Sequence, residues 1–202
     1  MNTFWNERYG QPGYAYGTQP NEFLVSVAQK IPAGRVLCLA EGQGRNAVYL
    51  AKLGYEVVAV DLSDVGLAKA ASLAAEQGVS LHTQVGNLAN FEIQPGSWQG
   101  IVSIFGHTPP AVRKPLHRRV VQGLAPGGVF LLEAYTPRQV EIGGIGGPRG
   151  EQADMLMSLS ELRAELEGLT LMHAAELDRD VNEGQFHMGT GAVVQIVGVK
   201  PK

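Results

Sequence analysis

The chain has 202 residues, of which 45% are hydrophobic and 17% are charged, and its formal net charge is -3 at pH 7. This length suits about one domain and is sufficient to bury one large core. The negative net charge removes the sequence-independent attraction to phosphate backbones on which most nucleic-acid binders rely. We therefore expect a single domain spanning residues 1–202, with no nucleic-acid partner and with residues 1–20 as an aromatic N-terminal segment.

Three further features bear on the location of the protein. No apolar run approaches the length of a membrane span, and residues 1–10 are polar and aromatic, unlike a signal peptide. The single cysteine, Cys38, lies in an apolar run, where we expect a buried core thiol. The densest basic stretch, residues 113–119, contains Arg113 and His117, and we interpret it as a solvated helix face. These features predict a cytoplasmic protein without membrane association.

Strand and helix patterns alternate along the chain. We expect helices at 21–30, 45–53, 64–77 and 112–123, and strands at 35–40, 55–60, 80–85, 98–105 and 128–135. Ser158 and Glu161 form a possible capping box for one more helix. The pattern predicts an α/β fold, a doubly wound three-layer sandwich with a mostly parallel sheet.

The most informative local pattern lies between residues 35 and 61. An apolar run typical of a buried parallel strand is followed by a turn that contains Gly42 and Gly44, and a helix begins near Arg45. Glycines let the backbone turn sharply and approach a ligand, while the free amides of a helix N-terminus attract polar groups. Asp61 follows the second strand, where a carboxylate can accept hydrogen bonds from both hydroxyls of a ribose. The pattern predicts a nucleotide or nucleoside site.

This pattern alone leaves the ligand open. Residues 42–47 also satisfy the dinucleotide pattern G-x-G-x-x-G/A, and Asp61 lies at the spacing expected of it. A dehydrogenase normally joins such a domain to a substrate domain, whereas 202 residues suit about one domain. The length therefore weakens the nicotinamide interpretation.

The rest of the chain carries a family resemblance. After Asp61-Leu62-Ser63 come the run 102–105 and a Pro126-Gly127-Gly128 turn into the fifth strand, a series that resembles the class I S-adenosylmethionine-dependent methyltransferases. Residues 4–9 and 14–17, the Gly44-Arg45-Asn46 turn and residues 183–187 look like the tellurite-resistance-type methyltransferase family. The resemblance covers nearly the whole chain. It implies a seven-stranded sheet whose segments 169–177 and 192–199 add an antiparallel C-terminal strand, with S-adenosylmethionine as cofactor.

The resemblance also assigns cofactor-binding residues. Cys38 stands where the wider superfamily usually carries an acid, and Glu41 can supply the missing acid, for example to the cofactor's amino group. Ala40 stands in place of the first turn glycine and fits a tight turn only if its φ is negative. Arg45 is implied to meet the methionine carboxylate, and Asn87 the adenine edge. The expected cofactor-binding residues are Tyr16, Glu41, Gly42, Gly44, Arg45, Asp61, Leu62, Asn87 and Leu88.

The catalytic candidates lie in loops at the carboxyl ends of the expected strands. Methyl transfer mainly requires alignment of donor and acceptor and, for a weak nucleophile, removal of a proton. His107 follows the fourth strand, Tyr135 ends the fifth, and His187 lies in the turn between the last two strands. The alternative for each is a purely structural loop or pocket residue. No His/Cys/Asp/Glu cluster has convincing metal-ligand spacing, so we expect no metal.

The sequence thus favours a methyltransferase, and the family resemblance suggests a small-molecule or chalcogen-oxyanion acceptor. Pro109-Pro110 is the sole match to the pattern after strand four in enzymes that methylate bases, which gives little support to nucleobase methylation. Two alternatives remain: a cofactor-binding sensor or resistance protein without turnover, and a nicotinamide dinucleotide-binding protein. The sequence does not fix the oligomeric state.

Overall fold

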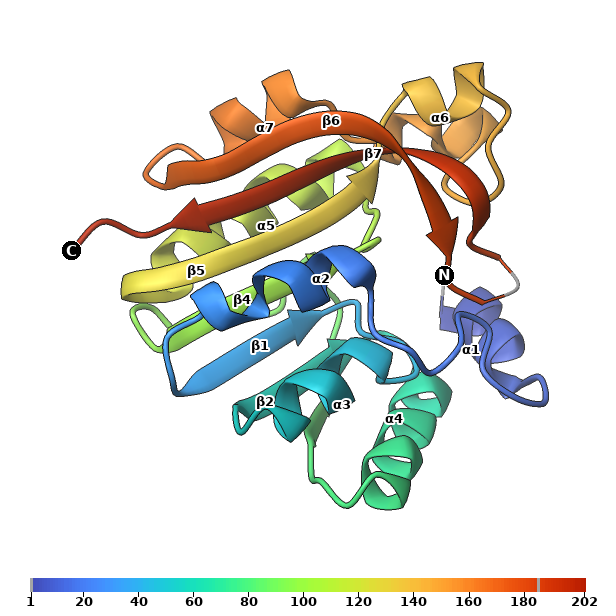
Figure 1. The fold of residues 1–202 in the computed structure, drawn as a ribbon, viewed down its shortest axis with the longest axis horizontal. Helices are drawn as coiled ribbons and strands as arrows, with labels where there is room; N and C mark the ends of the chain where they lie inside the picture. Colours follow the sequence, from blue (N-terminus) through green and yellow to red (C-terminus); the bar gives the residue numbers. More distant parts are fainter. Residues whose placement is uncertain (1, 185) are drawn as a thin grey trace.

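The computed structural model describes residues 2–184 and 186–202. At its centre is a seven-stranded sheet with the strand order β3-β2-β1-β4-β5-β7-β6 (Figure 1). The strands are β1 (Arg35–Leu39), β2 (Glu56–Asp61), β3 (His82–Val85), β4 (Trp98–Ile104), β5 (Leu124–Tyr135), β6 (Thr170–Asn182) and β7 (Met188–Val199). The first five strands pair in parallel, and β7 lies antiparallel between β5 and β6. The predicted fold class is confirmed.

Helices cover both faces of this sheet, as Figure 1 shows. The helices are α1 (Asn2–Gly10), α2 (Glu22–Val27), η1 (Ala28–Lys30), α3 (Arg45–Lys52), α4 (Asp64–Glu76), α5 (Pro110–Gly123), α6 (Arg138–Glu141), η2 (Gly150–Met155) and α7 (Leu159–Glu165). Helices α2, α3 and α4 contribute to one core, and α5 and α7 contribute to the other. The result is the predicted three-layer arrangement.

Each face has its own core because side chains alternate across a strand. In β1, Leu37 and Leu39 pack on the α5 side, while Val36 and Cys38 pack on the side of α2 and α3. Cys38 is fully buried, as predicted for a core thiol.

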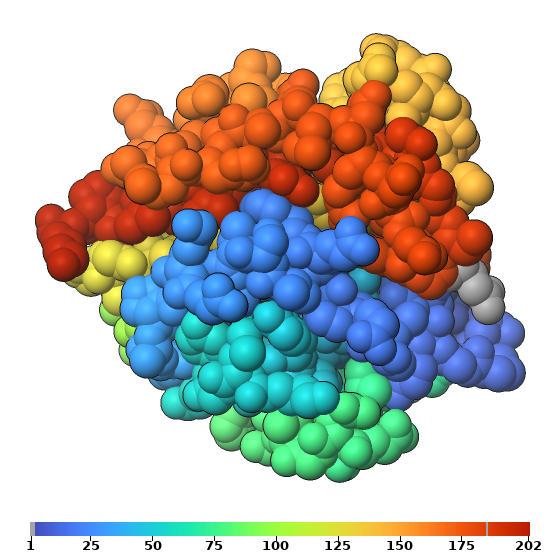
Figure 2. Space-filling view, viewed as in Figure 1, coloured from blue at the N-terminus to red at the C-terminus, as the bar shows by residue number. Residues whose placement is uncertain are grey.

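The leading helix and the last two strands differ from the prediction. The leading helix divides into α2 and η1, and Asn21 caps α2 by accepting a hydrogen bond from the Leu24 amide at 2.8 Å. The last two strands are longer than predicted, because their pairing continues to Asn182 opposite Met188. Polar and glycine residues at these strand ends hide the apolar pattern. The longer hairpin reaches the N-terminal segment, and Figure 2 shows the blue N-terminal residues directly against the red and orange strands.

The prediction of a solvated basic face on α5 is wrong for two of its residues. Arg113 is fully buried, and its Nη2 donates to Glu165 Oε1 at 2.9 Å. His117 is also buried, with Nδ1 at 2.7 Å from the Glu165 Oε2. The partner carboxylate comes from α7, far along the chain, so local sequence gave no sign of it. The capping box of Ser158 and Glu161 at the start of α7 is confirmed.

Candidate functional site

The carboxyl ends of β1 and β4 mark the point where the strand order reverses. Ligands of doubly wound sheets bind at such a switch point. Both ends hold a non-glycine residue in the left-handed region, Ala40 at φ +51° and Phe105 at φ +53°. This conformation costs a non-glycine residue roughly 1–2 kcal/mol, and such strain clusters at functional sites. From the sequence we expected a negative φ at Ala40. That expectation is wrong, and the fold tolerates the strain.

The turn after β1 has the shape predicted from its glycines. Gly42 and Gly44 take positive φ values of +64° and +91°, and α3 begins at the next residue. A Cβ atom on Gly44 would lie 2.6 Å from the Cβ of Ala70 in α4. Gly44 is therefore required both by the backbone angle and by the packing of α3 on α4.

Glu41 caps the N-terminus of α3. Its Oε1 accepts hydrogen bonds from the amides of Asn46 at 3.1 Å and Ala47 at 2.9 Å. Burial raises the pKa of Glu41 to about 7, although these two amides and Arg45 oppose the shift. One carboxylate oxygen is thus already committed to the helix, which leaves the other for a ligand group.

Asp61 is the last residue of β2 and ties this strand to the glycine turn. Its Oδ2 accepts from the Gly42 amide at 2.8 Å, and its Oδ1 accepts from the Ser63 amide at 2.8 Å. Burial raises the pKa of Asp61, while hydrogen bonds from the amides of Ser63, Gly42 and Leu62 lower it. A carboxylate has about four lone-pair sites, so Asp61 retains acceptor capacity for a ligand hydroxyl.

Tyr9 of α1 covers the glycine turn. A Cβ atom on Gly42 would lie 2.7 Å from the Tyr9 hydroxyl, and one on Gly66 would lie 2.8 Å from the Tyr9 ring. Tyr9 is buried, and its pKa is raised by burial and then by the charge of Asp61. The cofactor-binding residues expected from the sequence include Tyr16 of the same aromatic segment but not Tyr9.

Arg45 is buried and ion-paired. Its Nη2 lies 2.5 Å from Glu183 Oε2, on the turn between β6 and β7. The other oxygen of Glu183 accepts from Asn21 at 2.8 Å and from Arg179 at 2.7 Å. Sequence analysis noted residues 183–187 as a motif but gave Glu183 no role, because its partners are distant in sequence.

Glu133 continues this buried network inside β5. Its oxygens accept from Arg179 at 2.9 and 2.6 Å, from Asn21 at 2.6 Å and from Gln195 at 2.6 Å. The two arginines and two glutamates of the network balance in formal charge. Glu133 thus holds β5, β6, β7 and α2 together at the carboxyl edge of the sheet.

Next to this network lies a group of packed rings, which we call the aromatic cluster: Tyr16, Phe105, His107, Tyr135 and His187. The His187 ring lies 4.5 Å from both the Tyr16 and Phe105 ring centroids, and Phe105 lies 4.6 Å from Tyr135. His107 completes the cluster, 5.8 Å from Tyr135. The structure therefore brings together Tyr16 and all three catalytic candidates, although they come from distant parts of the sequence.

Two polar atoms of the cluster are buried without a hydrogen-bond partner among the described residues, the Tyr135 hydroxyl and His187 Nδ1. An unsatisfied buried group costs about 1–3 kcal/mol, so such atoms need an explanation. Burial, and then the charges of Arg45 and other cations, lower the pKa of His187 to about 2. The imidazole is therefore neutral and offers a free ring nitrogen beside a free hydroxyl.

His107 differs from His187 in this respect. Its Nε2 accepts from the Tyr135 amide at 3.0 Å, and its Nδ1 lies 3.1 Å from the Phe105 carbonyl oxygen, to which it donates. Burial lowers the pKa of His107 to about 4. Since both ring nitrogens are engaged, the geometry does not favour His107 as a base and makes it a positioning residue for the ends of β4 and β5.

The remaining expected cofactor residues lie beside β2 and β3. Leu62 is half-buried and directly follows Asp61. Asn87 is exposed, and its Oδ1 accepts from the Ala89 amide at 3.0 Å. Leu88 is buried, and its carbonyl accepts from Arg119 at 2.6 Å. Asn87 retains its side-chain amide donors for a ligand.

The described residues hold neither a candidate metal site nor a candidate membrane-spanning helix. No group of three or more His, Cys, Asp or Glu side chains in them has the arrangement of a metal site. Within the same residues, no helix has the length and apolar character needed to cross a membrane.

Comparisons with known proteins place this site in context. Residues 36–128 match the family described as "Methyltransferase domain". No curated protein matches the chain. The matched region runs from β1 to the start of β5 and contains the glycine turn, Asp61, Asn87 and His107.

Solved structures are similar over the whole chain. TehB from Haemophilus influenzae superposes with a TM-score of 0.74 at 18% identity, covering 98% of this chain and 66% of TehB. A protein studied for the conversion of a disulfide bond into a thioacetal group during echinomycin biosynthesis gives a TM-score of 0.78 at 16% identity, covering 100% of this chain and 93% of that one.

Phosphoethanolamine N-methyltransferase 2 from Haemonchus contortus, solved with S-adenosyl-L-methionine, gives a TM-score of 0.67 at 16% identity. That comparison covers 100% of this chain and 58% of the nematode enzyme. At these identities the likeness shows a shared fold. Residues 36–128 therefore match a methyltransferase domain, within a fold that this chain shares with TehB and the other two solved structures.

Proposed function

We propose that residues 1–202 act as one cytoplasmic methyltransferase domain that methylates a small-molecule acceptor. A chalcogen oxyanion is the acceptor suggested by the resemblance of residues 4–9, 14–17, 44–46 and 183–187 to the tellurite-resistance-type family. The observation that carries the proposal is the pair of free polar atoms on Tyr135 and His187, buried in the aromatic cluster beside the switch point. The net charge of -3 supports a small acceptor over a nucleic acid.

S-adenosylmethionine is the proposed cofactor, and the residues around the glycine turn fit it. Asp61 retains acceptor capacity for a ribose hydroxyl, and Gly42 and Gly44 supply the positive φ values that the adjacent turn requires. Arg45 is the proposed partner of the methionine carboxylate, which would share its guanidinium with Glu183. Tyr16, Glu41, Leu62, Asn87 and Leu88 are the further proposed contacts. When bound, the cofactor supplies a methyl group on a cationic sulfur.

The aromatic cluster suits methyl transfer from a cation. Aromatic faces attract a cation by about 0.5–2 kcal/mol, and Tyr16 and Phe105 present such faces around His187. The neutral His187 can hydrogen-bond to the acceptor through its free ring nitrogen, and the Tyr135 hydroxyl can orient it. His107 holds Tyr135 in place through the backbone.

The proposal is tested by measuring the demethylated cofactor, S-adenosylhomocysteine, after incubation with selenite, tellurite, a thiol or an amine as acceptor. We expect turnover with at least one of these acceptors and a loss of about 10-fold in kcat/KM for His187→Asn, which removes the proposed hydrogen bond to the acceptor. His82→Asn is the matched control, because His82 is exposed on β3. Cofactor binding without turnover of any acceptor would instead support a sensor or resistance protein.

A further inference from the structure

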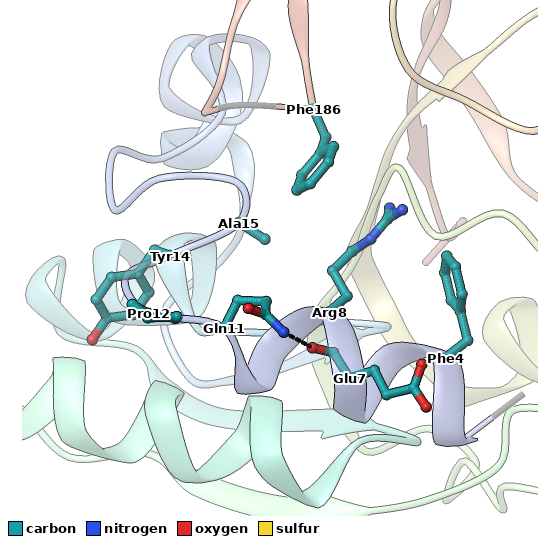
Figure 3. Close-up of a pocket in the computed structure, with 8 residues that line it drawn as sticks. All are labelled: Phe4, Glu7, Arg8, Gln11, Pro12, Tyr14, Ala15 and Phe186. Atoms are coloured by element: carbon teal, nitrogen blue, oxygen red, sulfur yellow. Dashed lines mark hydrogen bonds between the residues drawn. The ribbon is translucent and has the colours of Figure 1, made fainter.

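A surface pocket of ≈ 420 Å³ lies on the outer side of α1, outside the aromatic cluster. Figure 3 shows its lining, which includes Phe4, Glu7, Arg8, Gln11, Tyr14 and Phe186. We call this pocket the Arg8 groove. It lies where the first helix meets the tip of the β6–β7 hairpin, and none of the roles proposed above uses it.

Arg8 is held rigidly in this groove. Its guanidinium carbon lies 4.6 Å from the Phe4 ring centroid and 4.5 Å from that of Phe186. Its Nη1 donates to the Tyr16 hydroxyl at 2.9 Å. A stacked guanidinium fixed by one hydrogen bond loses little further freedom on binding, and its planar fork suits oxyanions.

Arg8 also lacks a counter-charge. Arg45 and Arg179 are paired with Glu183 and Glu133, but no carboxylate of the described residues lies within 4.0 Å of Arg8. Glu7 is the acidic residue of the groove, and Figure 3 shows its carboxylate directed away from the Arg8 guanidinium. The groove therefore presents one uncompensated cation between two aromatic rings.

The groove leads to the aromatic cluster. Tyr16 accepts the hydrogen bond from Arg8, and its ring lies 4.5 Å from the ring of His187. Phe186 lines the groove and is the direct neighbour of His187 in the chain. A ligand group on Arg8 would thus be one side chain away from the two free polar atoms of the proposed acceptor site.

We infer that the Arg8 groove is an anion-binding site, which receives the charged group of an anionic acceptor at the entrance to the aromatic cluster. The inference rests on the proposed function, because it names the charge of the acceptor. The ligand class is a small oxyanion or a carboxylate, bound by the free edge of the guanidinium and flanked by Phe4 and Phe186.

The test titrates the full chain with sodium selenite and with sodium benzoate, and follows tryptophan fluorescence because Trp5 lies 5.6 Å from the Arg8 guanidinium. Benzyl alcohol serves as the neutral counterpart of benzoate. We expect saturable binding of at least one anion, no saturation by the alcohol, and about 10-fold or more weaker anion binding by Arg8→Gln. Arg118→Gln, which alters an exposed arginine on α5, should bind as the unaltered protein does.

Arg8→Lys keeps the charge but loses the planar fork, and we expect an intermediate affinity. Equal anion affinity in Arg8→Gln and the unaltered protein, or no saturation by either anion, would overturn the inference. Titration of the same samples with S-adenosylhomocysteine separates the two proposals. Anion binding through Arg8 without nucleoside binding would support the anion site and refute the proposed function. Nucleoside binding without anion binding through Arg8 would refute the anion site alone.

Discussion

The Nε2 atom of His107 accepts a hydrogen bond from the backbone amide of Tyr135 at 3.0 Å. This contact links the loop after β4 to the last residue of β5, and the proton on Nδ1 is directed to the Phe105 carbonyl. A histidine in this position supports the neighbouring strand ends and has no free nitrogen for an acceptor. His187, which has a free Nδ1, is the better candidate for a hydrogen bond to an acceptor.

The first prediction concerns the pH dependence of stability. Burial lowers the pKa of His107 from 6.5 to about 4. Between these pH values the His107 side chain is protonated in the unfolded chain but neutral in the folded protein. The contribution of neutral His107 to the free energy of unfolding is therefore fully present above pH 6.5 and is lost as the pH decreases toward 4. His107→Gln should reduce the slope of unfolding free energy in this window by up to about 1.4 kcal/mol per pH unit.

Denaturant unfolding at several pH values measures this slope. His82→Gln, which removes an exposed histidine, is the control and should leave the slope as it is. An unchanged slope in His107→Gln would show that His107 protonates as easily in the folded protein as in the unfolded chain.

The second prediction concerns Asp61 and the cofactor. Asp61→Asn keeps the shape of the side chain but removes the charge and acceptor sites proposed for the ribose hydroxyls. Hydrogen bonds to a charged group contribute about 1.5–3 kcal/mol, so affinity for S-adenosylhomocysteine should fall about 10- to 150-fold. Calorimetric titration measures this loss, with the exposed Glu92→Gln as control. Equal affinities in the unaltered protein, Asp61→Asn and Glu92→Gln would show that Asp61 does not bind the cofactor.

The sequence predicted the layered fold because the buried strands and the glycine turn leave local signals. Gly42 and Gly44 need positive φ, and both have it. The contacts of Arg45 were not predictable in this way, since Glu183 lies 138 residues further along the chain. The candidate histidines show the same limit, because no local pattern separates His107 from His187; the Tyr135 amide that engages His107 comes from another strand.

Ala40 illustrates a different limit. A local rule forbids positive φ for alanine, yet the residue has φ +51°. Ala40 is held between β1 and the glycine turn, where the Glu41 amide donates to the Val60 carbonyl at 3.1 Å. Tertiary hydrogen bonds of this kind can impose a strained angle that no single-residue propensity predicts.

The third prediction follows from this strain. Ala40→Gly relieves about 1–2 kcal/mol of left-handed strain and adds about 0.5–1 kcal/mol of unfolded-state entropy, so we expect a net gain of about 0.5–1 kcal/mol in unfolding free energy. Ala71→Gly, at an exposed position in α4, should instead lose about 1 kcal/mol. Denaturant unfolding compares the two. Destabilisation of similar size in both variants would argue against strain at Ala40.

The fourth prediction concerns the buried ion pair between α5 and α7. Glu165→Gln removes the carboxylate 2.9 Å from the buried Arg113 and leaves the exposed Glu161, 3.4 Å away, as its remaining charge partner. Breaking a buried pair costs up to about 3–5 kcal/mol. Burial alone would raise the pKa of Glu165, but hydrogen bonds from His117 and Arg113 outweigh it and lower the pKa from 4.5 to about 2. The contribution of Glu165 to the free energy of unfolding is therefore lost as the pH falls from 4.5 to 2. Glu167→Gln, at an exposed neighbouring position, is the control. A small cost for Glu165→Gln at pH 7 would contradict this assignment.

The most direct test of the account is a calorimetric titration of the purified protein with S-adenosylmethionine and S-adenosylhomocysteine, with a nicotinamide dinucleotide as the competing ligand. The glycine turn and Asp61 satisfy the sequence pattern of both ligand classes, so this choice decides between them. The account predicts saturable binding of both sulfur nucleosides and none of the dinucleotide. Binding of the dinucleotide alone, or of no ligand at all, would contradict it.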